Sequence, residues 1–83
     1  MDRRRLLRRL VEGAVYNVRF TDFVNLVEAF GFALQRTEGS HHMFWHAGIL
    51  EALNLQSDRG QAKPCQIRHF VRLVERYNLR LEE

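Results

Sequence analysis

Three of the four histidines in this chain lie within residues 38–46, which read EGSHHMFWH. Imidazole takes up and releases protons near neutral pH, so a histidine can act as a general acid or base, and it is also a common metal ligand. The stretch therefore has three interpretations. It is a metal site, the centre of a histidine-dependent enzyme, or a strand that carries histidines on its surface.

The spacing of the histidines argues against a metal site. Within a strand, His42 and His46 are roughly 13 Å apart, whereas the ligands of one zinc ion lie within about 2 Å of it. His41 and His42 are neighbours, so their side chains point to opposite faces of a strand. No cysteine or histidine cluster elsewhere supplies further ligands. We therefore predict no metal and no cofactor.

Nucleophilic catalysis is also disfavoured. Cys65 and His69 are four residues apart on a predicted helix, so their side chains can meet. Cys65 alternates with apolar positions, however, and we expect it to be a small buried hydrophobic residue. Ser40 lacks the Gly-x-Ser-x-Gly motif of a nucleophile elbow. General acid–base chemistry remains. A histidine beside arginines could accept the proton of a ribose 2′-hydroxyl while the cations neutralise the phosphorane.

The composition fits an acidic partner, and it also fits an ordinary, mildly basic small protein. The net charge is +3, and Lys63 is the only lysine among thirteen basic residues. Arginine grips a phosphate through two N–H groups and stacks on bases, so nucleic acid or an acidic protein fits this charge. A single cysteine suits a reducing cytoplasm. No apolar run reaches the roughly 20 residues that span a bilayer, so we expect no secretory signal and no membrane partner.

Apolar residues at helical spacing predict three helices. Thr21 and Asp22 are good N-caps for the second helix, and Gly31 is a good C-cap for it. Pro64 suits the first turn of the third helix. The expected helices cover residues 3–12, 21–31 and 64–77.

Between the second and third helices the apolar residues alternate, which is typical of strands. Leu53 and Leu55 are expected to face inward. A sheet this small is covered by helices on one face only, which leaves the other face open to a ligand. We predict an α+β domain with a three-stranded antiparallel sheet and helices packed on one face. The expected strands cover residues 32–37, 41–46 and 49–56, with turns at 38–40 and 47–48 and a loop over 57–61.

One combination of residues resembles the HicA toxin family. Gly31-Phe32, Arg36 and Gly39-Ser40-His41 follow a helix in this order, and a further helix comes after the third strand. The resemblance covers residues 17–79 and implies a double-stranded-RNA-binding-like α-β-β-β-α core, with residues 1–13 as an additional basic amphipathic helix. HicA proteins are small cytoplasmic mRNA endonucleases, and each is encoded beside a HicB antitoxin that binds and blocks it.

The resemblance also implies a catalytic residue. The family's histidine follows the Gly-Ser pair, which places it on His41, with His42 as the fallback. Gly39 and Ser40 would shape the turn that presents it. Alternation leaves the choice open, because His41, Met43 and Trp45 share one face, and His42, Phe44 and His46 share the other.

Basic and aromatic residues supply the expected RNA contacts. Arg36 and Lys63 are candidates for phosphate contacts. Arg68 and Arg72 lie one turn apart on the last helix, followed by Arg76, and could line a phosphate track or a solvated helix face. Trp45 or Phe44 could stack a base.

The chain departs from the family pattern at one place. Many members carry Pro-x-His after the third strand and Gly-Thr-Leu at the start of the last helix. Here the corresponding segments read LQSD and AKPC. If the second histidine assists catalysis in those members, His46 or Lys63 would have to replace it.

We therefore predict the toxin of a type II toxin–antitoxin pair. It would be a cytoplasmic, ribosome-independent and metal-independent mRNA endoribonuclease that a HicB-like antitoxin neutralises. One alternative is a non-catalytic RNA-binding module of the same fold, and another is a domain that binds an acidic protein. The N-terminal helix has three candidate roles: RNA contact, self-association into a homodimer, or a solvated cap.

Overall fold

The computed structural model describes residues 2–82, which form three helices and a four-stranded antiparallel sheet. The strands lie in the order β1-β2-β3-β4, so each strand pairs with its neighbour along the chain. The helices are α1 (Arg3–Val11), α2 (Phe20–Ala29) and α3 (Pro64–Arg76), and the strands are β1 (Ala33–Glu38), β2 (His41–Trp45), β3 (Leu53–Asp58) and β4 (Gln61–Ala62).

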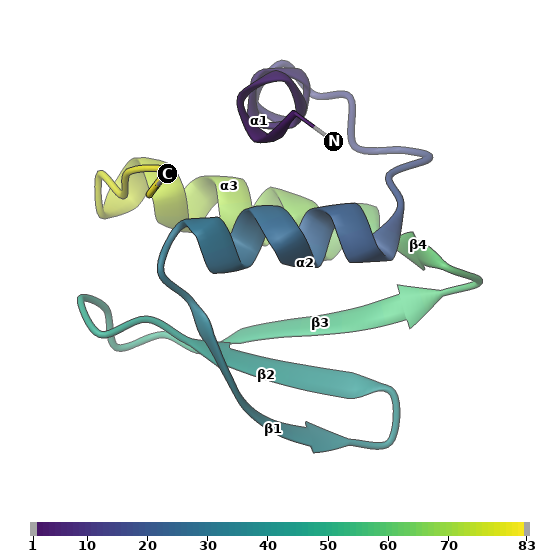
Figure 1. The fold of residues 1–83 in the computed structure, drawn as a ribbon, viewed down its shortest axis with the longest axis vertical. Coiled ribbons are helices and arrows are strands. Elements are labelled where there is room, and N and C mark those ends of the chain that lie inside the picture. The colour runs from purple at the N-terminus through teal and green to yellow at the C-terminus, as the bar shows by residue number, and fades with distance from the viewer. Residues whose placement is uncertain (1, 83) are drawn as a thin grey trace.

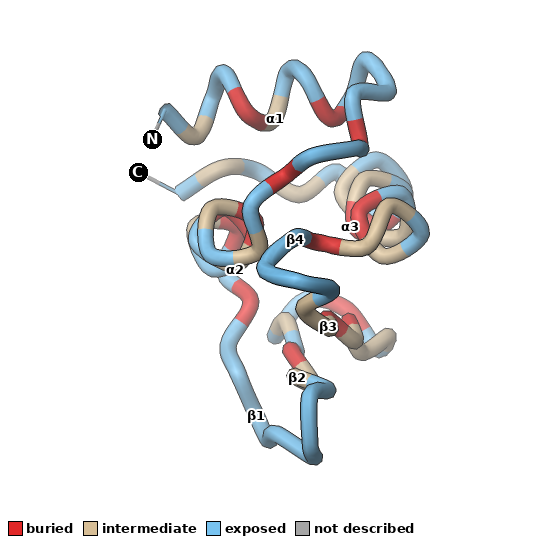
Figure 2. The backbone as a smooth tube through the Cα atoms, turned by 90° about the vertical axis from the view of Figure 1, so that its right-hand side faces the viewer, coloured by how far each residue is buried: buried red, intermediate tan, exposed pale blue. Residues whose placement is uncertain are grey.

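The elements form three layers (Figure 1). Helices α2 and α3 lie side by side over one face of the sheet, and α1 crosses them on the side away from the sheet (Figures 1 and 2). No element of residues 2–82 covers the opposite face of the sheet. The predicted α+β class with helices on one face is confirmed, but the sheet has four strands rather than three.

The core fills the space between the helices and the sheet, where buried positions of both layers face each other (Figure 2). The rings of Phe23 and Phe30 on α2 each lie 5.4 Å from the ring of Phe70 on α3, edge to face. Such aromatic pairs add about 0.5–1.5 kcal/mol beyond the burial of their area. The sheet contributes Phe44, Leu53 and Leu55, and α1 contributes Leu6 and Leu10.

Two of the predicted helix ends are confirmed and one is wrong. Gly31 follows the C-cap of α2 with a φ of +94°, and Pro64 is in the first turn of α3. Helix α2 begins at Phe20, however, with Arg19 at the N-cap and no side-chain hydrogen bond. Thr21 and Asp22 are therefore inside the helix and do not cap it.

The third strand lies further along the chain than predicted. It covers Leu53–Asp58, and Ile49 is buried in the preceding loop, where its N–H donates to the His46 carbonyl (3.2 Å). The predicted loop over residues 57–61 is a hairpin. Arg59 and Gly60, with φ of 53° and 83°, form the two-residue turn that joins β3 to β4.

None of the helices among residues 2–82 is long and apolar enough to cross a membrane.

Candidate functional site

Strand β2 presents its first two histidines to opposite faces of the sheet. Phe44 is 2% exposed and belongs to the core, and His42 lies on the same, helix-covered side. His41 lies on the other side together with Met43 and Trp45, and Trp45 is 46% exposed. Of the two aromatic residues considered for base stacking, Trp45 is thus accessible, and Phe44 is a core residue.

Strand pairing adds polar residues to the open side of the sheet. His41 pairs with Glu38 of β1 and with Gln56 of β3. Met43 pairs with Arg36 and with Asn54. Residues that pair directly across strands share a face, so these four side chains accompany His41. We define the His41 face by Arg36, Glu38, His41, Met43, Trp45, Asn54 and Gln56, together with Lys63 at its margin.

A chain of hydrogen bonds links Ser40 to Lys63. The Gln56 side-chain amide donates from Nε2 to Ser40 Oγ (2.9 Å) and accepts at Oε1 from Lys63 Nζ (2.9 Å). The backbone N–H of Gln56 donates to Gln66 Oε1 (2.8 Å), which ties β3 to α3. Because His41 follows Ser40 and pairs with Gln56, the Ser40–Gln56–Lys63 chain of hydrogen bonds lies at the end of β2 where His41 enters the sheet.

The hydrogen bond of His41 relates to which of its two ring nitrogens carries the proton. Its Nδ1 lies 3.3 Å from Asn54 Oδ1, and a carbonyl oxygen can only accept. In the tautomer that makes this hydrogen bond, Nδ1 carries the proton and the Nε2 lone pair is available. An exposed Nε2 with a lone pair is the atom that a general base uses.

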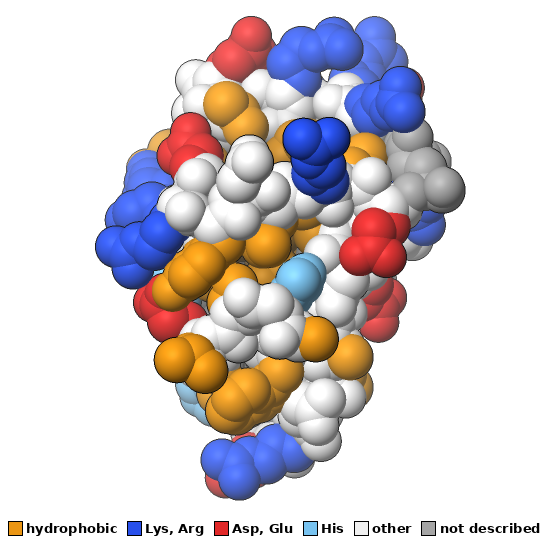
Figure 3. Space-filling view, turned by 90° about the vertical axis from the view of Figure 1, so that its left-hand side faces the viewer, with side chains coloured by type: hydrophobic (Ala, Val, Ile, Leu, Met, Phe, Trp, Pro, Cys, Tyr) orange, Lys and Arg blue, Asp and Glu red, His pale blue; other side chains and the backbone are white. Residues whose placement is uncertain are grey.

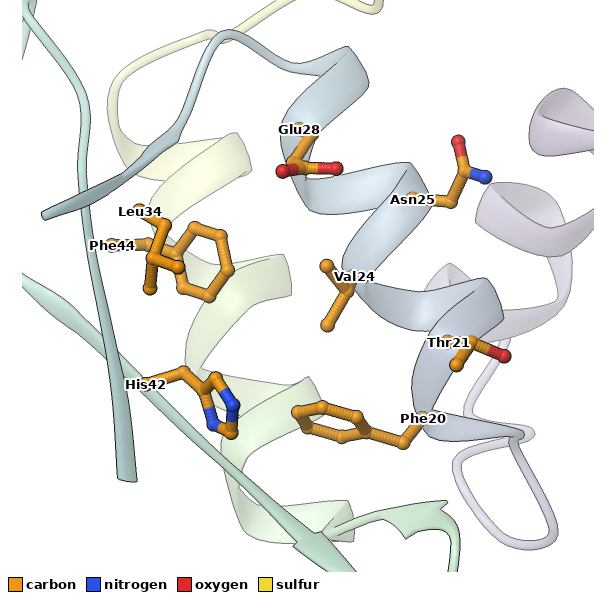
Figure 4. A pocket seen from close by; sticks show the side chains of 8 residues that line it. All are labelled: Phe20, Thr21, Val24, Asn25, Glu28, Leu34, His42 and Phe44. Carbon is orange, nitrogen blue, oxygen red and sulfur yellow. The ribbon is translucent and has the colours of Figure 1, made fainter. Parts of the chain in front are cut away.

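His42 occupies a different setting. It lies at one end of a hollow of about 260 Å³ between α2 and the β1–β2 hairpin, with its ring 5.5 Å from the Phe20 ring (Figure 4). Its Nδ1 is 3.1 Å from the Ser40 carbonyl oxygen and must donate to it. The walls are mostly apolar, Glu28 supplies a negative charge, and the lining residues include no lysine or arginine. This hollow is poorly suited to a phosphate.

The turn before His41 depends on Gly39. Its φ of +59° is in the left-handed region, which glycine adopts without steric cost. Gly39 and Ser40 connect β1 to β2, so they set the point at which His41 enters the sheet. Arg36 is exposed on the neighbouring strand, where its Nε lies 2.7 Å from Glu38 Oε1.

Arg68 and Arg72 do not join the His41 face. Both line a hollow of about 280 Å³ between α3 and the C-terminal end of α1. Helix α1 lies on the side of α3 away from the sheet (Figure 1), so these two arginines and His41 are in different layers. The predicted phosphate track on α3 therefore belongs to a separate surface.

His46 and Cys65 are the remaining residues that were considered for a chemical role. His46 follows the end of β2, accepts at Nδ1 from the Gly48 N–H (2.9 Å), and has its ring 5.1 Å from the Phe32 ring. Cys65 is exposed on the first turn of α3, so the prediction that it is buried was wrong. The reason is that Ile67 and Phe70, but not Cys65, face the core.

Asn54 and Gln56 belong to the candidate site and were not predicted from the sequence. The sequence carried a signal for them. Leu53 and Leu55 face inward, so alternation places Asn54 and Gln56 on the opposite face of the same strand. Their contacts with His41, Ser40 and Lys63 depend on the β2–β3 register, which a single sequence does not give.

Within residues 2–82, no three side chains of His, Cys, Asp or Glu gather closely enough to hold a metal ion. No family model, curated protein or solved structure matches this chain.

Proposed function

We propose that the His41 face binds single-stranded RNA and cleaves it by general acid–base chemistry. The observation that carries this proposal is that His41 lies on the sheet face that no helix covers and pairs with Gln56, whose side chain hydrogen-bonds to Ser40 and to Lys63. Phosphodiester transfer at a ribose uses a general base and a cation, and an imidazole and an ammonium group can supply them.

The reaction follows from the chemistry of these groups. Nε2 of His41 accepts the 2′-hydroxyl proton, and the 2′-oxygen attacks the adjacent phosphorus. The bond to the 5′-oxygen then breaks, and the products are a 2′,3′-cyclic phosphate and a 5′-hydroxyl end. Lys63 neutralises charge that develops on the phosphorane oxygens. The leaving oxygen takes its proton from solvent, because His42 lies on the opposite side of β2 and the His46 ring is engaged by Gly48 and Phe32.

Trp45 favours single-stranded RNA as the substrate. Its indole is exposed on the same face, beside a hollow of about 290 Å³ that it lines with Gln35, Arg36 and Met43. A base can stack on an indole only when it is not paired inside a duplex, and such stacking contributes about 1–3 kcal/mol per base. Arg36 borders the same hollow and would hold a neighbouring phosphate.

The wider role follows the resemblance to HicA proteins. The order α2-β1-β2-β3-α3 supports a double-stranded-RNA-binding-like topology, with β4 as an addition. In this proposal the chain is a cytoplasmic, ribosome-independent mRNA endonuclease toxin, and a HicB-like antitoxin blocks it.

The first test compares RNA cleavage by the wild-type protein, His41→Ala and His42→Ala in EDTA. General-base catalysis contributes about 10²–10⁴-fold, so His41→Ala is expected to cleave at least about 100-fold more slowly. His42→Ala is the matched control on the other face of the strand and is expected to retain cleavage. Equal rates for the wild type and His41→Ala would remove His41 from the mechanism.

RNA binding is measured in the same samples through Trp45, which is the only tryptophan. Stacking of a base is expected to quench its fluorescence. Quenching with no cleavage by any variant would favour the non-catalytic RNA-binding module. Cleavage without a change in Trp45 fluorescence would leave the histidine chemistry in place and remove Trp45 from the RNA contact.

A further inference from the structure

Helix α1 carries arginines that the fold does not use. Its apolar residues Leu6 and Leu10 are buried against α2 and α3, so the rest of the helix faces solvent. Arg5, Arg8 and Arg9 are exposed there, and α1 contains no acidic residue. Arg5 and Arg9 are one turn apart, and like charges at this spacing weaken a helix. Basic side chains, which on α1 are all arginines, gather at the top of the molecule over α1 (Figure 3).

Helix α3 extends this positive charge. Arg68 and Arg72 line the hollow beside Val11, at the C-terminal end of α1. Arg8 precedes Val11 by three residues and is therefore on the same flank of α1. Arg68 is held in position, because its Nη2 donates to the Tyr16 hydroxyl (3.3 Å) and its guanidinium lies 5.8 Å from the Tyr16 ring centre. We define the α1–α3 basic surface by Arg5, Arg8, Arg9, Arg68 and Arg72.

The charges of this surface are not neutralised within the described part of the chain. The ion pairs there are Arg36 with Glu38 and Arg76 with Glu51. No arginine of the α1–α3 basic surface has an ion pair with another described residue. Five guanidinium groups without an ion pair to another described residue outnumber the exposed carboxylates beside them, Glu12 and Glu75, and this positive charge favours a polyanion.

We propose that the α1–α3 basic surface binds the phosphate backbone of RNA, as a second contact outside the His41 face. The choice of RNA rests on the proposed function, whereas the choice of phosphate rests on the arginines, whose planar donors match phosphate oxygens. An anionic membrane offers phosphate groups as well. A helix that inserts into a membrane needs a free apolar face, however, and that of α1 is packed against α2 and α3.

The test measures the affinity of a labelled single-stranded RNA by fluorescence anisotropy at several salt concentrations. The test variant is Arg8→Gln/Arg72→Gln. The control is Arg19→Gln/Arg59→Gln, which makes the same charge change at exposed positions beside the β3–β4 hairpin. Circular dichroism confirms that both variants are folded.

The test variant is expected to bind on the order of tenfold more weakly than the control at low salt. Each phosphate contact on a single strand contributes about −0.7 to the slope of log affinity against log salt, so the slope should become shallower by about 1.4. Equal affinities and slopes for the two variants would overturn the proposal. Preferential, Arg8- and Arg72-dependent binding to phosphatidylserine vesicles would overturn it in favour of a membrane.

The experiment distinguishes a failure of the basic-surface proposal from a failure of the proposed function. All binding is measured in a His41→Ala background, so that RNA is not consumed. If wild-type protein fails to cleave RNA but binding still depends on Arg8 and Arg72, the proposed function is wrong and the basic surface stands. If cleavage depends on His41 but the test variant binds like the control, the proposed function stands and the basic-surface proposal is wrong.

Discussion

Gly13 and Gly31 illustrate how single residues end the helices of this protein. Each follows the C-cap of a helix and has a left-handed φ, +98° after α1 and +94° after α2. Their surroundings differ. A Cβ at Gly13 would have no atom within 4 Å, whereas one at Gly31 would lie 2.5 Å from Glu82 Oε2 and 3.1 Å from His46 Nε2.

Alanine at these two positions therefore separates backbone strain from crowding. Gly13→Ala is expected to lower the free energy of unfolding by about 1 kcal/mol, the cost of a left-handed φ for a residue with a Cβ. Gly31→Ala is expected to cost more, because the His46 ring is held by Gly48 and cannot move away freely. Urea denaturation of both variants checks the order. Equal losses of unfolding free energy would mean that the His46 and Glu82 side chains move aside without destabilising the protein.

Single residues also mark the limit of what the sequence could predict at the candidate site. The Gly39-Ser40 turn and the opposite orientations of His41 and His42 followed from residue types and strand alternation. Which histidine faced the helices did not, because both faces of β2 carry large apolar side chains. The answer depends on Phe44, which fills the core beneath α2 and α3 and thereby turns His42 inward and His41 outward.

At the level of elements, the loop between β2 and β3 is attached to the end of α3 by one carboxylate. Glu51 Oε2 accepts from the Tyr77 hydroxyl (2.8 Å) and lies 3.4 Å from Arg76 Nη1. The hydrogen bond to Glu51 raises the pKa of Tyr77 above its ordinary value of 10.0, because ionisation would remove the donated proton and set two negative charges together.

The raised pKa of Tyr77 determines how the stability of the protein changes with pH. Folding raises the pKa of Tyr77, so the contact stabilises the native state below about pH 10 and is lost as the pH rises through the raised pKa. In a Tyr16→Phe background Tyr77 is the only tyrosine. Alkaline titration of tyrosinate absorbance is expected to give a higher midpoint than the same titration with Glu51→Gln added. Identical midpoints would contradict the contact.

The helices could be predicted from the sequence more accurately than the strands. The apolar stripes of α2 and α3 and the signals at Gly31 and Pro64 are local, so they are readable along the chain. The position of β3 is set by pairing with β2, and its hairpin turn uses Arg59 with a φ of 53°, where asparagine or glycine would be the usual signal. Tertiary pairing therefore overrode local composition at residues 49–61.

On the scale of the whole molecule, the order of the layers gives the two sides different chemistry. The sheet side presents His41 and Trp45, and the opposite side presents Arg5, Arg8 and Arg9 of α1 with Arg68 and Arg72 of α3. The molecule measures 31 × 30 × 21 Å with a radius of gyration of 11.6 Å, close to the value of about 12 Å expected for a compact domain of this length.

This arrangement requires α1 to be part of the folded domain rather than an appendage. Leu10 is 2% exposed and packs against the α2–α3 layer, whereas Leu50, in the loop before β3, is 93% exposed. Leu10→Ala and Leu50→Ala remove the same atoms. We expect Leu10→Ala to lower the free energy of unfolding by about 2–5 kcal/mol, because it removes buried contacts and leaves a cavity. Leu50→Ala should change it by less than about 0.5 kcal/mol.

Denaturant unfolding followed by both Trp45 fluorescence and circular dichroism tests this expectation. Trp45 lies on the far side of the sheet from α1, so coincident transitions by the two probes mean that α1 and the sheet unfold as one unit. Under that condition Leu10→Ala shifts both transitions together. If Leu10→Ala behaved like Leu50→Ala, α1 would not be docked, and its arginines would bind RNA as a separate, mobile segment instead of a fixed surface.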